Sequence, residues 1–223
     1  MVEVVLWSCG ACPYAQRARI VLLAKEVPNY KINDLDNDIL LKKKEKPQEL
    51  LRKNPYGAVP VLDHGNHSIY ESAIIMTYLE DAFPGGVRLL PSDPKGRSVV
   101  SMLIADCDKK ITTMYPLMFN KDEAKTEEFE KNFTDALQFL DDKFNNISGD
   151  YFAGDEITLA DVAFVPFFER IKVAVEPLRG KKYLENFINL NNWYKRMQSF
   201  QPFVDSRMEQ SEMLEFYKKY INK

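Results

Sequence analysis

The chain has 223 residues, of which 45% are hydrophobic and 28% are charged, and its length suits one or two domains. This balance is typical of a folded globular protein and excludes a disordered chain. The formal net charge of -3 argues against a nucleic-acid partner, because a phosphate-binding surface needs an excess of lysine and arginine.

The start of the sequence and its hydropathy indicate a cytoplasmic protein. Residues 4–7 form a strand-like apolar run, without a basic leader or a small-residue cleavage site before it. No apolar stretch approaches the ~18 residues that a membrane span requires. The three cysteines cannot all pair within one chain, so we expect free thiols in a reducing compartment.

The first 82 or so residues alternate between strand and helix patterns. Strands are expected at residues 2–7, 30–35, 58–63 and 67–70. Helices are expected at residues 13–25, 39–53 (interrupted by Pro47) and 72–82. This order, βαβαββα, predicts an α/β domain over residues 1–82 that is built on a small mixed sheet.

The remainder of the chain has a helical pattern. The sequence PGG at 84–86 ends the last helix of the first domain, and Pro91 and Pro94 mark a connector, which places a linker at 83–92. Helices are expected near residues 97–120, 123–146, 158–176, 182–198 and 207–221. An all-α domain is therefore predicted over residues 93–223.

The local motifs in the helical half indicate structural rather than catalytic residues. Thr158 and Asp161 fit a capping box, with aspartate in place of the usual glutamate. Pro166 should kink the helix that they begin. The aromatic residues within 164–168 and the thiol of Cys107 are interpreted as core.

Cys12 is the strongest candidate for a reactive group. It follows the first strand and precedes Pro13, and proline is favoured at the first position of a helix because its missing N–H would be unpaired there. A cysteine at this point faces free N–H groups and the positive end of the helix dipole, which stabilise the thiolate and lower the thiol pKa. The thiolate is the species that attacks sulfur or carbon. The alternative is a buried structural cysteine.

Four sequence segments, in their order and spacing, resemble a known family. They are 12–17 (CPYAQR), 53–62 (KNPYGAVPVL), 69–74 (IYESAI) and, in the helical half, 158–161 (TLAD) followed by 167–170 (FFER). The chain resembles the cysteine-type glutathione transferases: the omega class most, and also the lambda class and the dehydroascorbate reductases. Its CPY opening is similar to that of glutaredoxins, with Ala15 in place of the second cysteine.

This resemblance implies a thioredoxin-like N-terminal domain, an all-α glutathione transferase C-terminal domain and an active site between them. It implies a thioltransferase and dehydroascorbate reductase that uses glutathione as a substrate, through a Cys12–glutathione mixed disulfide resolved by a second glutathione. Conjugation to aryl halides is expected to be weak. The implied partners are glutathionylated or electrophilic small molecules and proteins, with no nucleic acid and no membrane. Omega enzymes are dimers, whereas the other two classes are usually monomers. The resemblance therefore leaves both a homodimer and a monomer as alternatives.

The resemblance also assigns glutathione-binding roles to two pairs of residues. Val59 and Pro60 form an X–Pro bond, the context in which a cis peptide costs least, and the Val59 backbone would pair with the extended tripeptide. Ser72 and the free N–H groups of its helix would bind the γ-glutamyl carboxylate, and Glu71 would bind the ammonium group. The alternatives are a plain turn proline, a helix cap and a surface acid.

Lys46 is assigned to the glycine carboxylate of glutathione on the same resemblance. Counted back from Val59, it falls where the omega pattern has a lysine, whereas residues 36–45 look like an insertion. The alternative is a solvated lysine, as its neighbours at 42–44 are expected to be.

Cys9 introduces a second mechanism, since a Cys-x-x-Cys pair near a βαβ pattern can indicate dithiol chemistry. In thioredoxin the nucleophile comes first, but the family pattern makes Cys12 the nucleophile here. Cys9 is therefore a redox partner only as a minor alternative, through a Cys9–Cys12 disulfide. No metal is expected, because His64 and His67 supply no convincing zinc ligands with two cysteines.

The rival hypothesis is a non-catalytic binding or scaffolding protein on the same fold, such as a chloride-intracellular-channel-like protein, since a fold does not fix a function. The presence of Cys12, Glu71 and Ser72 favours the enzyme. The first helix lacks an apolar span, which argues against membrane insertion.

Overall fold

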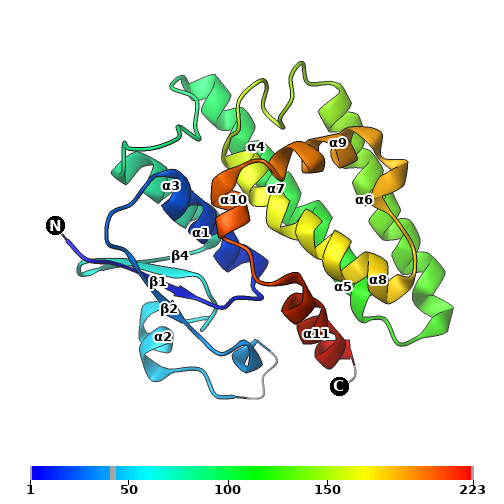
Figure 1. Cartoon of the computed structure of the whole chain (residues 1–223), viewed down its shortest axis with the longest axis horizontal. Coiled ribbons are helices and arrows are strands. Elements are labelled where there is room, and N and C mark those ends of the chain that lie inside the picture. The colour runs from blue at the N-terminus through cyan, green and yellow to red at the C-terminus, as the bar shows by residue number, and fades with distance from the viewer. Residues whose placement is uncertain (1, 41–43, 222–223) are drawn as a thin grey trace. The chain divides into compact units, whose positions relative to one another are not determined.

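The computed structural model of the chain describes residues 2–40 and 44–221. The chain divides into two compact units, residues 1–89 with 202–208 and residues 90–201 with 209–223. The first is a four-stranded thioredoxin-like α/β unit and the second is helical, so the predicted fold class is confirmed (Figure 1). The sequence-based boundaries placed residues 202–208 in the helical domain, whereas they group with the first unit.

The sheet of the first unit has the strand order β2-β1-β3-β4. Its strands are β1 (Val4–Ser8), β2 (Lys31–Asp34), β3 (Val61–His64) and β4 (His67–Tyr70). β1 pairs in parallel with β2 and antiparallel with β3, and β3 pairs antiparallel with β4. Leu6 stands opposite Ile32 and Leu62. Because β1 lies between two neighbours, it is mostly buried and carries the apolar run seen in the sequence.

Three α-helices complete the first unit. α1 (Pro13–Ala24) and α3 (Ser72–Ala82) pack together on one face of the sheet, and α2 (Gln48–Lys53) lies on the other (Figure 1). The predicted helix at 39–53 is wrong in its first part: a 3₁₀ turn, η1 (Asn37–Ile39), comes first, and α2 begins only after Pro47. Residues 41–43 lie outside the described part. The physical reason is Pro47, which pushes the residue before it out of the α conformation.

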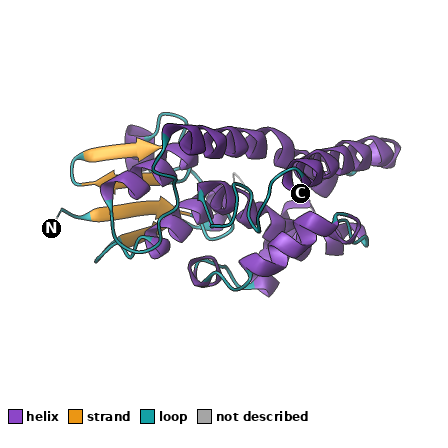
Figure 2. Ribbon diagram, turned by 90° about the horizontal axis from the view of Figure 1, so that it is seen from above, coloured by secondary structure: helices purple, strands orange, loops and turns teal. Residues whose placement is uncertain are grey.

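The second unit is an assembly of helices, whereas the strands gather in the first unit (Figure 2). Its elements are α4 (Pro94–Lys110), η2 (Ile111–Thr113), α5 (Met114–Phe119), η3 (Glu123–Lys125), α6 (Thr126–Asn145), α7 (Leu159–Arg170), η4 (Ile171–Val175), α8 (Glu176–Arg179), η5 (Leu184–Asn186), α9 (Ile188–Met197) and α11 (Gln210–Ile221). α10 (Gln201–Asp205) lies at the return to the first unit.

Two of the long helices predicted from the sequence are interrupted. The helix expected at 97–120 breaks at η2, because Pro116 has no N–H to donate to the carbonyl four residues earlier. The helix expected at 158–176 passes through η4, a π-helical turn, before α8. Pro177 removes the corresponding α-helical bond there.

The start of α7 is a buried polar cap, as predicted. The side chains of Thr158 and Asp161 form a capping box. The Asp161 carboxylate also accepts hydrogen bonds from the Phe152 N–H at 3.0 Å and the Trp193 Nε1–H at 2.8 Å. Phe168, one of the aromatic residues assigned to the core, is fully buried against Trp193. Cys107 is buried as predicted.

The described helices include none that is both long enough and apolar enough to cross a membrane.

Candidate functional site

Cys12 lies at the N-terminus of α1, where the sequence placed it. It is the N-cap residue, with an extended backbone, and Pro13 follows at the first helical position. Its side chain is 7% exposed and makes no capping hydrogen bond. Its N–H donates to the Cys9 carbonyl oxygen at 3.0 Å, which closes a tight turn before the helix. The Sγ therefore lies close to the helix end, where the backbone dipoles favour an anion.

Val59, from another of the predicted segments, contacts Cys12. The Val59–Pro60 peptide bond is cis. The Cys12 Sγ lies 3.9 Å from the Val59 carbonyl oxygen, and the Val59 side chain packs against the cluster of Cys9, Cys12 and Ala15. The structure thus brings the Cys-Pro and Val-Pro motifs, 47 positions apart, into contact.

The loop that leads to Val59 is held by its own hydrogen bonds. The Asn54 Nδ2 donates to the Ala58 carbonyl oxygen at 2.8 Å, and its Oδ1 accepts from the Tyr56 N–H at 3.0 Å. Gly57 has a φ of 58°, and a Cβ there would come within 2.7 Å of the Lys46 and Leu51 side chains. Glycine is therefore favoured at this position by the positive φ, whereas the side-chain ends that a Cβ would meet could shift.

Lys46 lies beside this loop rather than in open solvent. Its ammonium donates to the Tyr56 carbonyl oxygen at 3.1 Å, and the residue is exposed. A carboxylate could approach the ammonium without displacing a packed side chain. No described contact joins Lys46 directly to Cys12, so its assignment to glutathione stays a prediction.

Glu71 and Ser72 form the entry to α3. Glu71 is the N-cap residue and has a φ of 72°, a left-handed conformation that is costly for a residue with a side chain. Ser72 is the first helical residue and is buried, whereas Glu71 is exposed. The free N–H groups of this 11-residue helix and the Ser72 hydroxyl make a suitable environment for a carboxylate.

Arg17 supports Ser72 from α1, a role that the sequence alone does not predict. Its guanidinium is fully buried and donates to the Ser72 Oγ at 3.1 Å. It also lies over the Tyr14 ring, 4.9 Å from the centroid. Because Ser72 accepts this bond, its own hydroxyl hydrogen can be directed to another acceptor. The only signal in the sequence was the place of Arg17 within the segment CPYAQR.

The turn before Cys12 is held by two residues that the sequence analysis missed. The Arg19 guanidinium donates to the Ser8 Oγ at 2.6 Å and to the carbonyl oxygens of Cys9 at 3.2 Å and Gly10 at 3.1 Å. The Asn37 Oδ1 accepts from the Ala11 N–H at 3.0 Å. Asn37 belongs to the segment interpreted as an insertion, so that segment also holds the turn before Cys12.

Cys9 has a different environment from Cys12. It is fully buried, and its Sγ donates to the Asp36 carbonyl oxygen at 3.8 Å. Burial, with the nearby Cys12 and Asp34, raises the pKa of the Cys9 thiol to about 12. Cys9 therefore stays protonated near neutral pH and is a poor nucleophile.

The described residues contain no group of three or more histidine, cysteine, aspartate or glutamate side chains that could hold a metal ion.

Comparisons with known proteins show the family to which the chain is related. Residues 6–86 match the family model for the glutathione S-transferase N-terminal domain, and residues 104–200 match the one for the C-terminal domain. Glutathione S-transferase omega-1 of Sus scrofa is 30% identical over 193 residues, which cover 86% of this chain and 75% of that protein.

Solved structures are similar over almost the whole chain. The tau class glutathione S-transferase from mango, Mangifera indica, has a TM-score of 0.86 and 27% identity, covering 97% of this chain and 98% of that one. Glutathione transferase Omega 3C from Trametes versicolor has a TM-score of 0.79 and 27% identity, covering 98% and 90% of the two chains.

Proposed function

Because the chain belongs to the glutathione S-transferase family, with omega-class proteins among its relatives, we propose that it is a glutathione-dependent thioltransferase and dehydroascorbate reductase. Cys12 is the proposed nucleophile. Glutathione is both the thiol that is transferred and the reductant. The proposed reaction consumes reduced glutathione, so the cytoplasm is the compartment in which we propose that it takes place.

The observation that carries the proposal is the position of the Cys12 Sγ. It lies at the N-terminus of a 12-residue helix and 3.9 Å from the backbone of the cis Val59–Pro60 loop. Helix N–H groups favour a thiolate there. A backbone carbonyl beside the thiol can pair with an extended tripeptide and bring its sulfur to Cys12.

The proposed chemistry proceeds in two thiol–disulfide exchanges. The Cys12 thiolate attacks the glutathione sulfur of a mixed disulfide, forming Cys12–S–S–glutathione, and the substrate sulfur leaves as a thiolate that takes up a proton. A second glutathione, as its thiolate, attacks the glutathione sulfur of this bond. Oxidised glutathione leaves and the Cys12 thiolate is regenerated. With dehydroascorbate, two glutathiones supply two electrons and two protons, and the products are ascorbate and oxidised glutathione.

Ser72, with Arg17 behind it, is proposed to bind the γ-glutamyl carboxylate of glutathione. Glu71 is proposed to bind the ammonium group and Lys46 the glycine carboxylate. Each of these contacts is remote from the reacting sulfur, so they contribute affinity and position rather than chemistry.

The test is the Cys12→Ala variant, assayed with a glutathionylated peptide and with dehydroascorbate. We expect both activities to fall at least about a thousandfold, while circular dichroism remains that of the wild type. Cys107→Ala, which removes a thiol buried in the second unit, is the control and should stay active.

Two other outcomes would contradict the proposal. Unchanged activity in Cys12→Ala would remove the assigned nucleophile. Tight glutathione binding by the wild type, without turnover of either substrate, would favour the non-catalytic binding protein instead.

A further inference from the structure

The turn that leads into Cys12 is bound from one side by the guanidinium of Arg19. Arg19 lies on α1 and is buried. Its guanidinium donates to the Ser8 Oγ at 2.6 Å, the Cys9 carbonyl oxygen at 3.2 Å and the Gly10 carbonyl oxygen at 3.1 Å. Three consecutive residues therefore share one planar cation. The fixed fork of an arginine suits this arrangement, whereas a lysine ammonium does not reproduce it.

These bonds fix the backbone that carries the nucleophile. The Cys9 carbonyl oxygen also accepts from the Cys12 N–H at 3.0 Å, so one oxygen joins the cation to the first backbone group of Cys12. A carbonyl oxygen that turned toward the Cys12 Sγ would bring partial negative charge to it and disfavour the thiolate. Arg19 holds the carbonyl oxygens of Cys9 and Gly10 and offsets their partial charge.

Ionisable groups from the surrounding segments interact with the turn or with Arg19. They are Cys9 in the turn, Tyr14 in α1, Tyr30 before β2, Asp34 at the end of β2, Asp36 at η1 and Asp205 in α10. Burial and the Cys12 sulfur raise the pKa of the Cys9 thiol most, and Asp34 and Asp36 raise it further. The Arg19 guanidinium lowers the same pKa. The nearby carboxylates thus oppose a thiolate at this turn, and Arg19 acts against them.

We propose that Arg19 is a positioning residue for the nucleophile, which binds the turn before Cys12 and thereby favours the Cys12 thiolate near neutral pH. Arg19 acts through the backbone of the turn rather than through contact with a substrate. The inference rests on the proposed function, in which Cys12 is the nucleophile. It can nevertheless be tested on the sulfur itself, without turnover.

The test is the rate at which iodoacetamide alkylates Cys12 between about pH 5 and pH 10, with fragment mass spectra that assign the adduct to Cys12. We expect the midpoint of the wild type to lie below the ordinary thiol value of about 8.5. In Arg19→Met the midpoint should rise by roughly one pH unit, at the lower end of the effect of a nearby opposite charge.

Arg19→Lys separates the position of the turn from the charge. It keeps the cation but lacks the fork, so its midpoint should lie between those of the wild type and Arg19→Met. It also decides the case if circular dichroism shows that Arg19→Met does not fold. In both variants, glutathione-dependent turnover should fall at about pH 6.5 and recover as the pH rises above the shifted midpoint. A purely structural defect would lower turnover equally at every pH.

Arg52→Met is the matched control, since Arg52 is an exposed arginine on α2 of the same unit. It makes the same change of charge and should keep the wild-type midpoint. An unshifted midpoint in folded Arg19→Met, or in Arg19→Lys, would overturn the inference while leaving Cys12 as the nucleophile. A wild-type midpoint near 8.5 would overturn the activated thiolate of the proposed function, and this inference with it.

Discussion

Two cysteines three positions apart are both buried but differ in their position relative to α1. Cys12 lies at the N-terminus of α1, which favours its thiolate. Cys9 is fully buried, and burial is the main cause that raises its thiol pKa to about 12. Position relative to the helix end therefore distinguishes the two thiols, although the two residues are chemically identical, and it supports Cys12 as the proposed nucleophile.

The first prediction is that Cys9→Ser keeps most of the glutathione-dependent activity. A thiol with a pKa of about 12 is almost fully protonated at pH 7, so it cannot compete with free glutathione for the Cys12–glutathione bond. Mass spectrometry after one equivalent of oxidised glutathione should show the adduct on Cys12. A dominant Cys9–Cys12 disulfide, together with lost activity in the variant, would instead establish a dithiol route.

The second prediction concerns Arg17 and Ser72. Ser72→Ala and Arg17→Met should each raise the KM for glutathione roughly tenfold and change kcat little, because they would weaken the proposed carboxylate contact, which is remote from the reacting sulfur. Thr77→Ala is the control on the same helix, since its hydroxyl donates to the Ala73 carbonyl oxygen of its own turn. Steady-state kinetics with varied glutathione would decide. A fall in kcat at constant KM would be inconsistent with the assigned role.

At the scale of the elements, β3 holds a charged cluster at the edge of the core. The Asp63 carboxylate accepts from the Trp7 Nε1–H at 2.9 Å and the Ser68 Oγ–H at 2.5 Å, and it pairs with Lys53 at 3.0 Å. Burial raises the pKa of this carboxyl, but the three partners outweigh burial and hold the pKa below its ordinary value. The ionised form is therefore favoured by folding.

The third prediction follows from that shift. A carboxyl group whose pKa is lowered by folding stabilises the folded state at pH values above its unfolded-state pKa of about 3.9. This contribution is lost as the pH falls through the folded-state pKa. Acidification below about pH 4 should therefore destabilise the wild type more than Asp63→Asn. Urea unfolding between pH 3 and pH 7 would measure this difference. Asp135→Asn, an exposed aspartate on α6, should show the wild-type pH dependence. If the free energy of unfolding changed with pH in the same way in Asp63→Asn and in the wild type, Asp63 would have no role in the pH dependence of stability.

At the scale of the whole molecule, the chain returns to its first unit after it has formed most of the second unit. Residues 202–208 belong to the first unit. The Gln16 Nε2 donates to the Ser206 Oγ at 3.2 Å, 190 positions along the chain, and both side chains are buried. A segment from near the C-terminus therefore contributes to the stability of the thioredoxin-like unit.

The fourth prediction tests this return. Ser206→Ala should destabilise the first unit by about 1 kcal/mol, because a buried hydrogen bond is lost. Hydrogen exchange of the α1 amides should become faster, while that of α6 should not change. Ser199→Ala, whose exposed hydroxyl bonds to the Arg196 carbonyl oxygen, is the control. Unaltered exchange in α1 would mean that the segment contributes nothing to the unit.

The sequence by itself determined the features that depend on neighbouring residues. Periodicity specified the order of strands and helices, because apolar side chains must recur at the spacing of the element that buries them. The Cys12-Pro13 pair predicted the N-terminus of α1, and Thr158 with Asp161 predicted the start of α7. These signals are local, so they could be recognised without knowing what packs against them.

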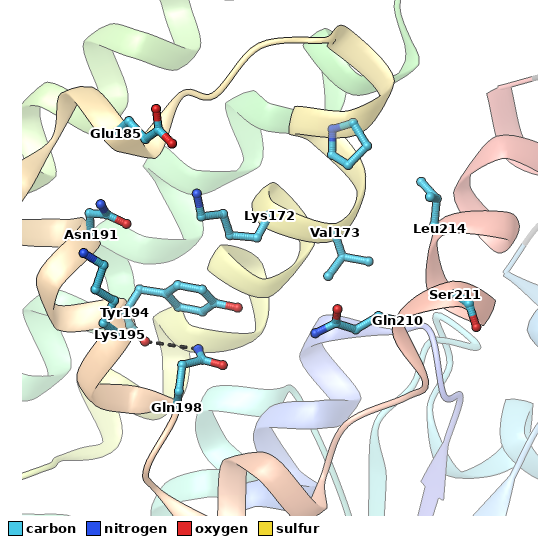
Figure 3. Close-up of a pocket in the computed structure, with 11 residues that line it drawn as sticks. Lys172, Val173, Glu185, Asn191, Tyr194, Lys195, Gln198, Gln210, Ser211 and Leu214 are labelled. Carbon is cyan, nitrogen blue, oxygen red and sulfur yellow. Dashed lines mark hydrogen bonds between the residues drawn. The ribbon is translucent and has the colours of Figure 1, made fainter.

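The tertiary structure alone decided the contacts between distant positions. It paired Arg17 with Ser72, placed Asn37 behind the turn before Cys12, and returned residues 202–208 to the first unit. It also formed a pocket lined by residues of η4, α8, η5, α9 and α11 (Figure 3). A hydrogen bond or a cavity between such positions exists only after the whole unit has packed. No local pattern encodes it, because its free energy depends on residues that are far apart in the chain.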